Sequence, residues 1–377
     1  MASYEDLGNG KYRLFAELGY DAKGKRIRKS KTVKASGVRE LNRLLQAFDM
    51  EVSSNANIEP GRLSFNAFVD RWKENYALPK LSASTLEVYD GILKDILPYF
   101  ESKYMKDITT FHIVQYFTKE KNEGRGSLEK KYNILMSIFK HATEWKVITE
   151  NPMTGVDKPK VPKKKIQFYN KSEIEQLFQE IKALEPRHQL MVKLALVGGL
   201  RRGEVLGIAY DQVDFGNNRI HIKRSLQYTK AEGLKLKGTK TEDERTVTFP
   251  PNLMKQLHRY YIKQLNNRME VGKLWKGFKD IDGEEVMLFV CDEFGIPYQP
   301  NAVTRFWGRF MKRTNLKRIR FQDLRHSSAS LILSEGVNMK VLQNRLGHKN
   351  IKTTLNIYSH ITEKDDEKAS DVFKDLL

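Results

Sequence analysis

The sequence predicts a multidomain α+β protein with three parts: a small amino-terminal β-sheet plus a helix, a helical bundle, and a mainly α domain with a small antiparallel sheet. Apolar residues alternate with polar ones near the amino terminus and in one later insert, which is the period of strands. Elsewhere they recur every three or four residues, as in amphipathic helices. The length of 377 residues suggests about two or three domains.

The first part, residues 1–58, reads as a sheet followed by a helix. A turn signal at Gly8 to Gly10 precedes an alternating strand from Tyr12 to Leu18, and a second strand follows from Ile27 to Val33. Ser36 opens a helix, and the polar stretch from Ser53 to Gly61 is typical of a linker.

The second of these strands is dense in positive charge and contains no acid. Such a strand suits a β-ribbon that lies on a phosphate backbone or in a major groove. The alternative is an edge strand that lysines protect against aggregation. The basic residues that we expect to contact nucleic acid here are Lys25, Arg26, Arg28, Lys29 and Lys31.

The second part, residues 62–157, is helical throughout and is expected to form a compact bundle of about four helices. A basic linker, residues 158–166, follows it. Two prolines favour extended backbone there, and Lys163, Lys164 and Lys165 repel one another. We interpret it as a tether that can lie across phosphates, although a passive, solvated linker is also consistent with the composition.

The third part, residues 167–377, is expected to be mainly helical. The spacing of Ser172 and Glu175 predicts a capping box at its first helix, and a second helix covers Gln189 to Val197. A strand-rich insert runs RIHIKRSLQ, LKLKGTKT and RTVTF, with DFGNN and TEDE as its turns. Helices resume from Leu253.

Composition limits the function classes. Sixty-six Lys and Arg against 47 Asp and Glu give a formal charge of +19, spread along the chain, which favours a polyanionic partner, and nucleic acid over a membrane surface. No apolar run approaches the roughly 20 residues that span a bilayer, and no signal sequence is evident. The single cysteine, Cys291, excludes an internal disulfide and a Cys-based zinc site. We expect a soluble, cytoplasmic protein.

Five places in the third part hold polar groups in apolar or helical settings. Arg201 and Glu204 stand between apolar runs, where an ion pair is either structural or functional. Lys240 precedes an acidic turn, and Gln322 lies three residues before Arg325, on the same side of a helix. His348 follows a helix-ending glycine.

The fifth is Tyr358. Asn350 can cap a helix whose Ile351, Leu355 and Tyr358 share one face. Taken alone, that pattern is typical of a buried ring in a helical core.

In this order and spacing, the motifs GLRRGE, LKGTKTEDERTV, FQDLRHSSAS and LGHKNIKTTLNIYSH resemble those of the tyrosine recombinase (phage integrase) family. The layout ahead of them resembles integrases of temperate phages and conjugative transposons with an arm-binding amino-terminal domain. The resemblance implies an arm-type DNA-binding domain at 1–58, a core-binding domain at 62–157 and a catalytic domain at 167–377.

The resemblance also implies roles. Tyr358 attacks a DNA phosphate and forms a 3′-phosphotyrosyl bond, which conserves the ester energy without ATP. Arg201 and Arg325 grip the phosphate oxygens in place of a metal, and no cofactor is expected. Lys240 protonates the leaving oxygen, His348 donates a hydrogen bond, and Glu204 supports Arg201.

One position departs from the family pattern. Gln322 stands where the family usually has histidine. Glutamine can donate a hydrogen bond to the phosphate, but it cannot act as a base or carry charge. His326, which is next to Arg325, does not replace it, because adjacent helical residues point about 100° apart.

The resemblance implies core and arm attachment sites on double-stranded DNA, a homotetramer on DNA, a possible host bending factor and an excisionase, and a bacterial host cytoplasm. Three other interpretations remain open: a DNA-binding protein of the same fold without catalysis, a metal-dependent nuclease or transposase, and a type IB topoisomerase. The acids Asp211, Asp214 and Asp323 sit singly in the sequence, whereas a metal nuclease needs convergent carboxylates.

Overall fold

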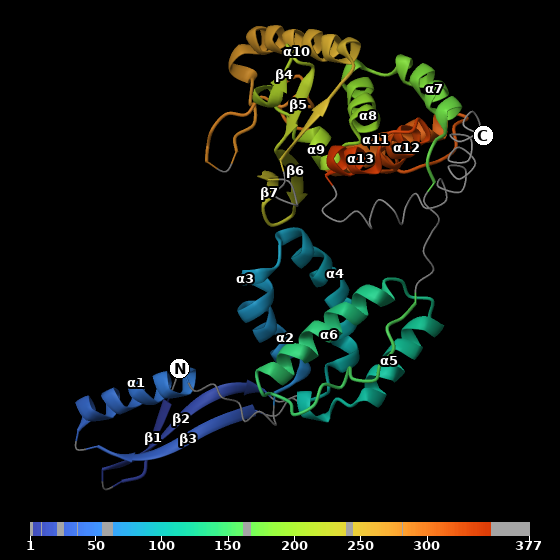
Figure 1. Cartoon of the computed structure of the whole chain (residues 1–377). Coiled ribbons are helices and arrows are strands. Elements are labelled where there is room, and N and C mark those ends of the chain that lie inside the picture. Colours follow the sequence, from blue (N-terminus) through green and yellow to red (C-terminus); the bar gives the residue numbers. More distant parts are fainter. Residues whose placement is uncertain are drawn as a thin grey trace. The chain divides into compact units, whose positions relative to one another are not determined.

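The computed structural model describes residues 3–8, 10–20, 26–35, 37–54, 63–160, 167–238, 244–280 and 282–347. At residues 17–20, 26–29, 39 and 49–54 it describes the backbone alone. The chain divides into two compact units, Met1–Lys163 and Lys164–Leu377, here called the amino-terminal and carboxy-terminal units. The described residues are mixed α and β, which confirms the predicted fold class (Figure 1).

The amino-terminal unit begins with a three-stranded antiparallel sheet in the order β1-β2-β3. Leu14 and Ala16, on either side of the half-buried Phe15, are buried against Leu41 and Phe48 of the helix that follows. The two expected strands and the helix are present, and the sheet has a first strand that we had not predicted. The elements are β1 (Ser3–Asp6), β2 (Lys11–Tyr20), β3 (Arg26–Lys34) and α1 (Val38–Ser54).

The helical bundle of this unit has the four expected helices, the first of which continues through a π-helical turn into a short extension. Ser64 and Ser82 accept hydrogen bonds from backbone N–H groups at the starts of α2 and α4, which fixes where these helices begin. Its core includes Trp72, Phe100 and Phe139. The elements are α2 (Phe65–Trp72), η2 (Lys73–Ala77), α3 (Leu78–Lys80), α4 (Ala83–Phe100), η3 (Met105–Asp107), α5 (Thr110–Asn122) and α6 (Leu128–Glu144).

The carboxy-terminal unit is mainly helical, as expected. The predicted capping box at its first helix was wrong by two residues. Asn170, not Ser172, accepts from the backbone N–H of Glu173, and Glu173 accepts from the N–H of Asn170, because the chain turns into the helix two residues earlier than the Ser-x-x-Glu spacing suggests. The helices are α7 (Lys171–Glu180), η4 (Ile181–Ala183), α8 (Pro186–Gly198), α9 (Arg202–Leu206), η5 (Tyr210–Gln212), α10 (Pro251–Val271), η6 (Gly272–Leu274), α11 (Pro300–Arg313), α12 (Asp323–Ser334) and α13 (Met339–Leu346).

The strand-rich insert forms two sheets where one was predicted. Strands β4, β5 and β8 make a three-stranded antiparallel sheet, and β6 and β7 make a separate hairpin. The strands on either side of TEDE therefore do not pair with each other as the arms of a hairpin. Ile220 and Ile222 of β5 face the core beside Val247 of β8, and this shared burial decides the pairing. The strands are β4 (Val213–Asp214), β5 (Arg219–Ile222), β6 (Arg224–Thr229), β7 (Gly233–Gly238) and β8 (Arg245–Thr248).

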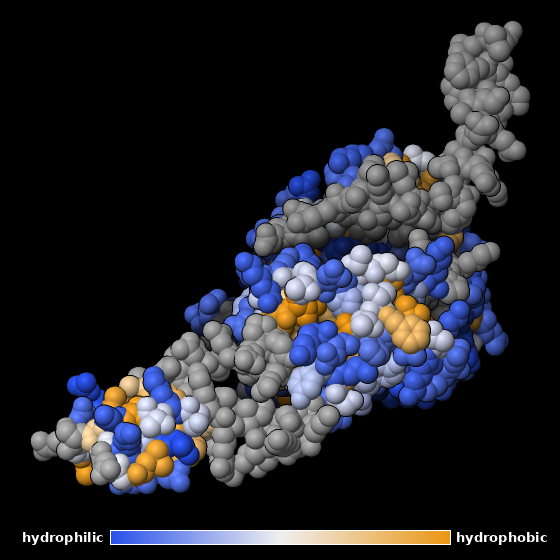
Figure 2. All heavy atoms as spheres, turned by 90° about the horizontal axis from the view of Figure 1, so that it is seen from below, coloured by the Kyte–Doolittle hydropathy of each residue, from blue (hydrophilic) through white to orange (hydrophobic). Residues whose placement is uncertain are grey.

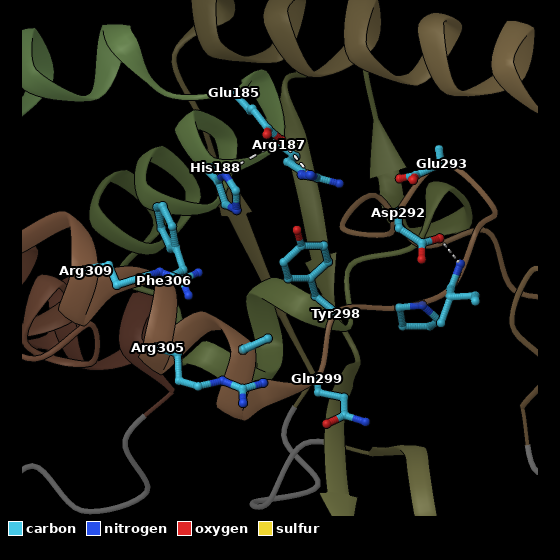
Figure 3. A pocket seen from close by; sticks show the side chains of 13 residues that line it. Glu185, Arg187, His188, Asp292, Glu293, Tyr298, Gln299, Arg305, Phe306 and Arg309 are labelled. Atoms are coloured by element: carbon cyan, nitrogen blue, oxygen red, sulfur yellow. Dashed lines mark hydrogen bonds and ion pairs between the residues drawn. The ribbon is translucent and has the colours of Figure 1, made fainter.

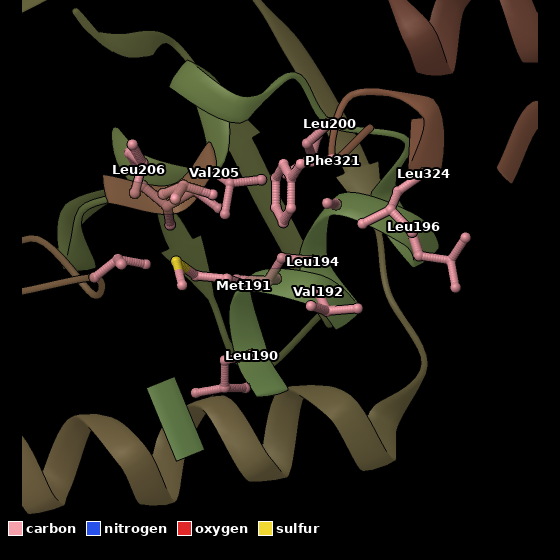
Figure 4. Packing of buried hydrophobic residues seen from close by; sticks show 14 of the residues in the cluster. Leu190, Met191, Val192, Leu194, Leu196, Leu200, Val205, Leu206, Phe321 and Leu324 are labelled. Atoms are coloured by element: carbon pink, nitrogen blue, oxygen red, sulfur yellow. The ribbon is translucent and has the colours of Figure 1, made fainter. Parts of the chain in front are cut away.

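Helix α8 lies at the centre of the core of this unit. Its residues from Leu190 to Gly198 are buried except Lys193 and Val197, which are half-buried, and it packs against α9, α10 and α12. Figure 4 shows residues of α8 and α9 together with Leu200, Phe321 and Leu324 in the same apolar cluster. The residues that flank Arg201 and Arg325 in sequence are thus held in one rigid core.

Hydrophilic residues predominate on the face that Figure 2 shows, and hydrophobic side chains reach it in small separate groups. Among the helices that the structure describes, none is both long enough and apolar enough to cross a membrane.

Candidate active site

Arg201 lies at the break between two helices. Helix α8 ends at Gly199, which has a left-handed backbone with φ of +60°, and α9 begins one residue after Arg201. The Arg201 Nη1 donates to Glu204 Oε1 at 2.7 Å, and its backbone N–H donates to Glu204 Oε2 at 2.8 Å. The side chain of Arg201 is 31% exposed while that of Glu204 is 2% exposed. The guanidinium is therefore held at the surface by an acid beneath it.

Arg325 occupies the first turn of α12 and is buried. Its Nη1 donates to the carbonyl of Gly199 at 2.8 Å, and its Nη2 donates to the carbonyl of Leu346 at 2.7 Å. These carbonyls stand at the carboxy-terminal ends of α8 and α13, where free acceptors and the helix dipole favour a cation. A guanidinium has five N–H donors, and these two bonds use one on each terminal nitrogen.

The end of α13 also holds Arg201. The Arg201 Nη2 donates to the carbonyl of Gly347 at 3.3 Å, one residue beyond the carbonyl that Arg325 uses. Two arginines that are 124 positions apart in the sequence thus meet at adjacent carbonyls, immediately before His348.

A third arginine belongs to the same network and was missed by the sequence analysis. Arg245, the first residue of β8, is 7% exposed and donates to both carboxylate oxygens of Glu204, from Nη2 at 2.6 Å and from Nη1 at 3.2 Å. Arg245 directly follows the acidic stretch TEDE, where an arginine is expected to be solvated, so no local pattern pointed to this role.

The charge state of Glu204 follows from these contacts. Burial alone raises the pKa of this carboxyl, but the hydrogen bond and the charge of Arg245, with those of Arg201, outweigh burial and bring the pKa below its ordinary value. Glu204 is therefore ionised at neutral pH and can hold two cations.

Gln322 precedes α12 and lies beside the start of α9. Its Oε1 accepts from the backbone N–H of Arg202 at 3.3 Å. A backbone N–H can only donate, so this contact assigns the oxygen end of the amide and leaves the NH₂ end to donate elsewhere.

Several expected site residues lie outside the described residues: Tyr358, His348 and Lys240, and the lysines Lys25, Lys163, Lys164 and Lys165. For Arg26, Arg28 and Lys29 the structure places the backbone in β3 but not the side chain, and Lys31 is exposed on the same strand. The described part of the site therefore comprises Arg201, Glu204, Gln322 and Arg325, with Arg245 added. Within the described residues no cluster of three or more His, Cys, Asp or Glu side chains is arranged to hold a metal ion.

A cavity of about 820 Å³ lies elsewhere in the same unit, and none of these five residues lines it (Figure 3). His188 stacks on Phe306 in its wall, with ring centroids 4.0 Å apart. Its charged lining residues are three arginines and three acids, so their formal charges cancel and the cavity favours neither an anion nor a cation. They are Arg187, Arg305, Arg309, Glu185, Asp292 and Glu293.

Comparisons with known proteins identify the family to which this chain is similar. Residues 167–365 match the model of the Phage integrase family, and residues 64–121 match the Phage integrase, N-terminal SAM-like domain. The chain is 24% identical to the tyrosine recombinase XerC-like of Caldanaerobacter subterraneus subsp. tengcongensis, over 99% of this chain and 98% of that protein. It is 25% identical to the ICEBs1 integrase of Bacillus subtilis, over the full length of both.

Solved structures share the fold. The Tn1549 transposon integrase, in complex with transposon right end DNA, matches with a TM-score of 0.65 and 18% identity, over 81% of this chain and 97% of that one. A lambda integrase tetramer bound to a Holliday junction matches with a TM-score of 0.60 and 18% identity, over 92% of this chain and 95% of that one.

Proposed function

Because this chain belongs to the phage integrase family and is a tyrosine site-specific DNA recombinase, we propose that the arginine network around Glu204 binds the phosphate at which DNA is cut and rejoined. The observation that carries the proposal is the meeting of Arg201 and Arg325 at the carbonyls of Gly347 and Leu346. The ICEBs1 relative supports integration and excision of a mobile element as the biological role.

In the proposed reaction, the Tyr358 oxygen attacks the phosphorus and the bond from phosphorus to the 5′ oxygen breaks. Tyr358 loses its phenol proton to solvent and becomes linked to the 3′ phosphate, and the 5′ oxygen takes a proton from Lys240, which solvent then reprotonates. The reverse attack by a 5′ hydroxyl rejoins the strand and frees the tyrosine, so the number of ester bonds is unchanged.

Arg201 and Arg325 stabilise the charge that grows on the non-bridging oxygens as phosphorus becomes five-coordinate. Both are anchored on the protein side, by Glu204 and by helix carbonyls, so little reorganisation is needed when the phosphate arrives. His348 and the NH₂ group of Gln322 donate further hydrogen bonds to the phosphate. Since Gln322 cannot accept a proton, the pKa of Tyr358, about 10 for a free tyrosine, must be lowered by the surrounding cations.

In this proposal the other parts of the chain bind DNA and assemble the subunits into a complex. We assign arm-type DNA binding to residues 1–58 with the basic strand β3, core-site binding to the bundle at 62–157, phosphate contacts to the linker 158–166, and catalysis to residues 167–377. The lambda integrase tetramer on a Holliday junction supports a tetramer on DNA for this chain as well. A host bending factor and an excisionase complete the proposed assembly, which works in the bacterial cytoplasm.

The test traps the full chain on nicked duplexes that carry candidate attachment junctions. The wild type is expected to become covalently attached to the 3′ end of the cut strand, in EDTA as well as without it, and Tyr358→Phe is expected not to. Attachment that persists in Tyr358→Phe, or that EDTA abolishes, would refute the proposed chemistry.

A further inference from the structure

Arg245 is bound through all three of its guanidinium nitrogens. Nη1 and Nη2 donate to the two oxygens of Glu204, and Nε donates to the carbonyl of Arg345 at 2.9 Å. Both acceptors belong to the protein and the side chain is buried. Arg245 is therefore placed to hold other groups of the site and is not presented to solvent.

Glu204 links Arg245 to Arg201. Glu204 Oε1 accepts from the Nη1 of each arginine, and Oε2 accepts from the Arg201 backbone N–H and from the Arg245 Nη2. Two pairs of hydrogen bonds, one pair from Arg201 and one from Arg245, together set the orientation of the Glu204 carboxylate. Bidentate arginine–carboxylate pairs fix geometry more tightly than single bonds, so removing one fork frees the carboxylate to rotate.

The other end of Arg245 reaches the same helix end that holds the remaining arginines. Three successive carbonyls at the end of α13 each accept from a different arginine: Arg345 from Arg245, Leu346 from Arg325, and Gly347 from Arg201. A Cβ atom at Gly347, which has φ of +65°, would lie 3.0 Å from the Arg245 Nη1. The segment that leads into His348 is thus packed directly on Arg245.

We propose that Arg245 is a positioning residue that sets Arg201, through Glu204, and the end of α13, through the Arg345 carbonyl, in the geometry needed for cleavage. This inference rests on the proposed function. Arg245 does not contact DNA; its effect on the reaction passes through the residues that do.

Two measurable consequences distinguish a positioning role for Arg245 from a direct contact with DNA. Loss of Arg245 should lower the rate of the chemical step by about 10- to 100-fold, the usual size for outer-shell partners and for displacements of about 1 Å. DNA affinity should stay within about twofold, and its salt dependence should not change, because a lost phosphate contact would reduce the slope by about 1.

The experiment measures single-turnover covalent attachment of the full chain to a nicked cognate duplex, with DNA affinity measured separately at several salt concentrations. The variants are Arg245→Met and Arg245→Lys, which keeps the charge but loses the fork. The matched control is Arg224→Met, since Arg224 pairs with the exposed Asp211 at 3.1 Å in the same unit. The control should cleave within about twofold of the wild type, as expected for an exposed pair.

A double-mutant cycle identifies the route of the effect. If Arg245 acts through Arg201, its removal should slow cleavage much less in an Arg201→Ala background than in the wild type. Equal slowing in both backgrounds, or a loss of affinity with a changed salt slope, would overturn the inference. If Arg245→Met does not fold, the same cycle with Arg245→Lys decides, since that variant retains a buried cation beside Glu204.

The proposed function can fail separately. If the wild type never becomes attached to DNA, or Tyr358→Phe still does, the proposed function is wrong. If both behave as expected and the Arg245 variants cleave at the wild-type rate, only the positioning role is wrong.

Discussion

Each unit of the protein buries a glutamate among cations, and the two arrangements differ in balance. In the amino-terminal unit, Glu120 is 2% exposed and pairs with Arg125 and with Lys131, which is 1% exposed. Each of these cations has a second acid, Asp95 for Lys131 and Glu123 for Arg125. Three acids therefore serve two cations, and neither cation lacks an acidic partner.

In the carboxy-terminal unit one acid serves two arginines. Glu204 pairs with Arg201 and Arg245, and its partner Arg201 is 31% exposed. Positive charge is in excess, and part of it faces outward. The comparison teaches that a buried acid whose cations are all neutralised leaves no positive charge for a ligand, whereas a buried acid that supports more cations than it neutralises prepares a site for an anion.

Removing a cation from the site should have the largest effect. Arg325→Ala is expected to slow covalent attachment by at least about 10²- to 10³-fold, because a preorganised donor to the developing charge is lost. Arg325→Lys should recover little, since a single ammonium group cannot bridge the carbonyls of Gly199 and Leu346. Single-turnover assays on a nicked duplex would show this, and near-wild-type cleavage by either variant would contradict it.

The ion pairs of Glu120 in the helical bundle should affect the stability of the bundle and not the cleavage rate. Glu120→Gln is expected to destabilise the bundle by about 3 kcal/mol, because it leaves buried Lys131 without its closest acid. Hydrogen exchange of the α5 and α6 amides would measure this, with Glu123→Gln, at an exposed pair, as a control below about 1 kcal/mol. Cleavage by the bound complex should not change, and a large loss of cleavage rate would remove the distinction between the two networks.

Gln322 permits a matched pair of substitutions. Gln322→His should cleave as fast as the wild type or faster, because one ring nitrogen can accept from the Arg202 N–H while the other donates to the phosphate. Gln322→Glu keeps the acceptor and the shape but loses the donor, and its negative charge repels the phosphate. We expect it to cleave about 10- to 100-fold more slowly, the range of a positioned proton donor or hydrogen-bond donor. Equal rates for the two variants would show that Gln322 does not face the phosphate.

The smallest expected effect is on the stability of the carboxy-terminal unit at low pH. Because the pKa of Glu204 is lowered in the fold, its contribution to stability is fully present above its ordinary pKa of 4.5 and is lost as pH falls through the lower, folded value. In Arg245→Met the main lowering influence is absent, so the carboxy-terminal unit should lose less stability on acidification below pH 4.5. Thermal unfolding of both proteins from pH 6 to pH 3 would reveal the difference, and parallel curves would contradict it.

Local patterns in the sequence predicted much of this structure. Alternation at Leu14 and Ala16 predicted the amino-terminal sheet, and period-3.6 spacing predicted the bundle. The pairing of the strands was harder to predict from sequence. Strand β8 pairs with β5, which lies more than 20 residues earlier, because both bury residues in the same core, and it does not pair with the strand just before it. Arg201, Glu204 and Arg325 could be recognised because polar groups stand out in apolar runs.

Arg245 could not be recognised in that way. It follows TEDE in a charged stretch, where an arginine is expected to be solvated, and its importance comes from two contacts made far away in the chain, at Glu204 and Arg345. Residues whose partners are distant and whose neighbours are charged carry no local signal. Gln322 itself was recognised as a site residue, but its contact with the backbone N–H of Arg202, 120 positions earlier, had no such signal.

The three successive carbonyls at the end of α13 have a practical consequence for protein engineers. A residue inserted or deleted between Leu342 and Gly347 rotates the helix end by about 100° and offers each arginine the wrong carbonyl at once. Fusions, tags and altered loops meant to retarget this recombinase therefore belong outside that segment, for example at the exposed turn between β6 and β7.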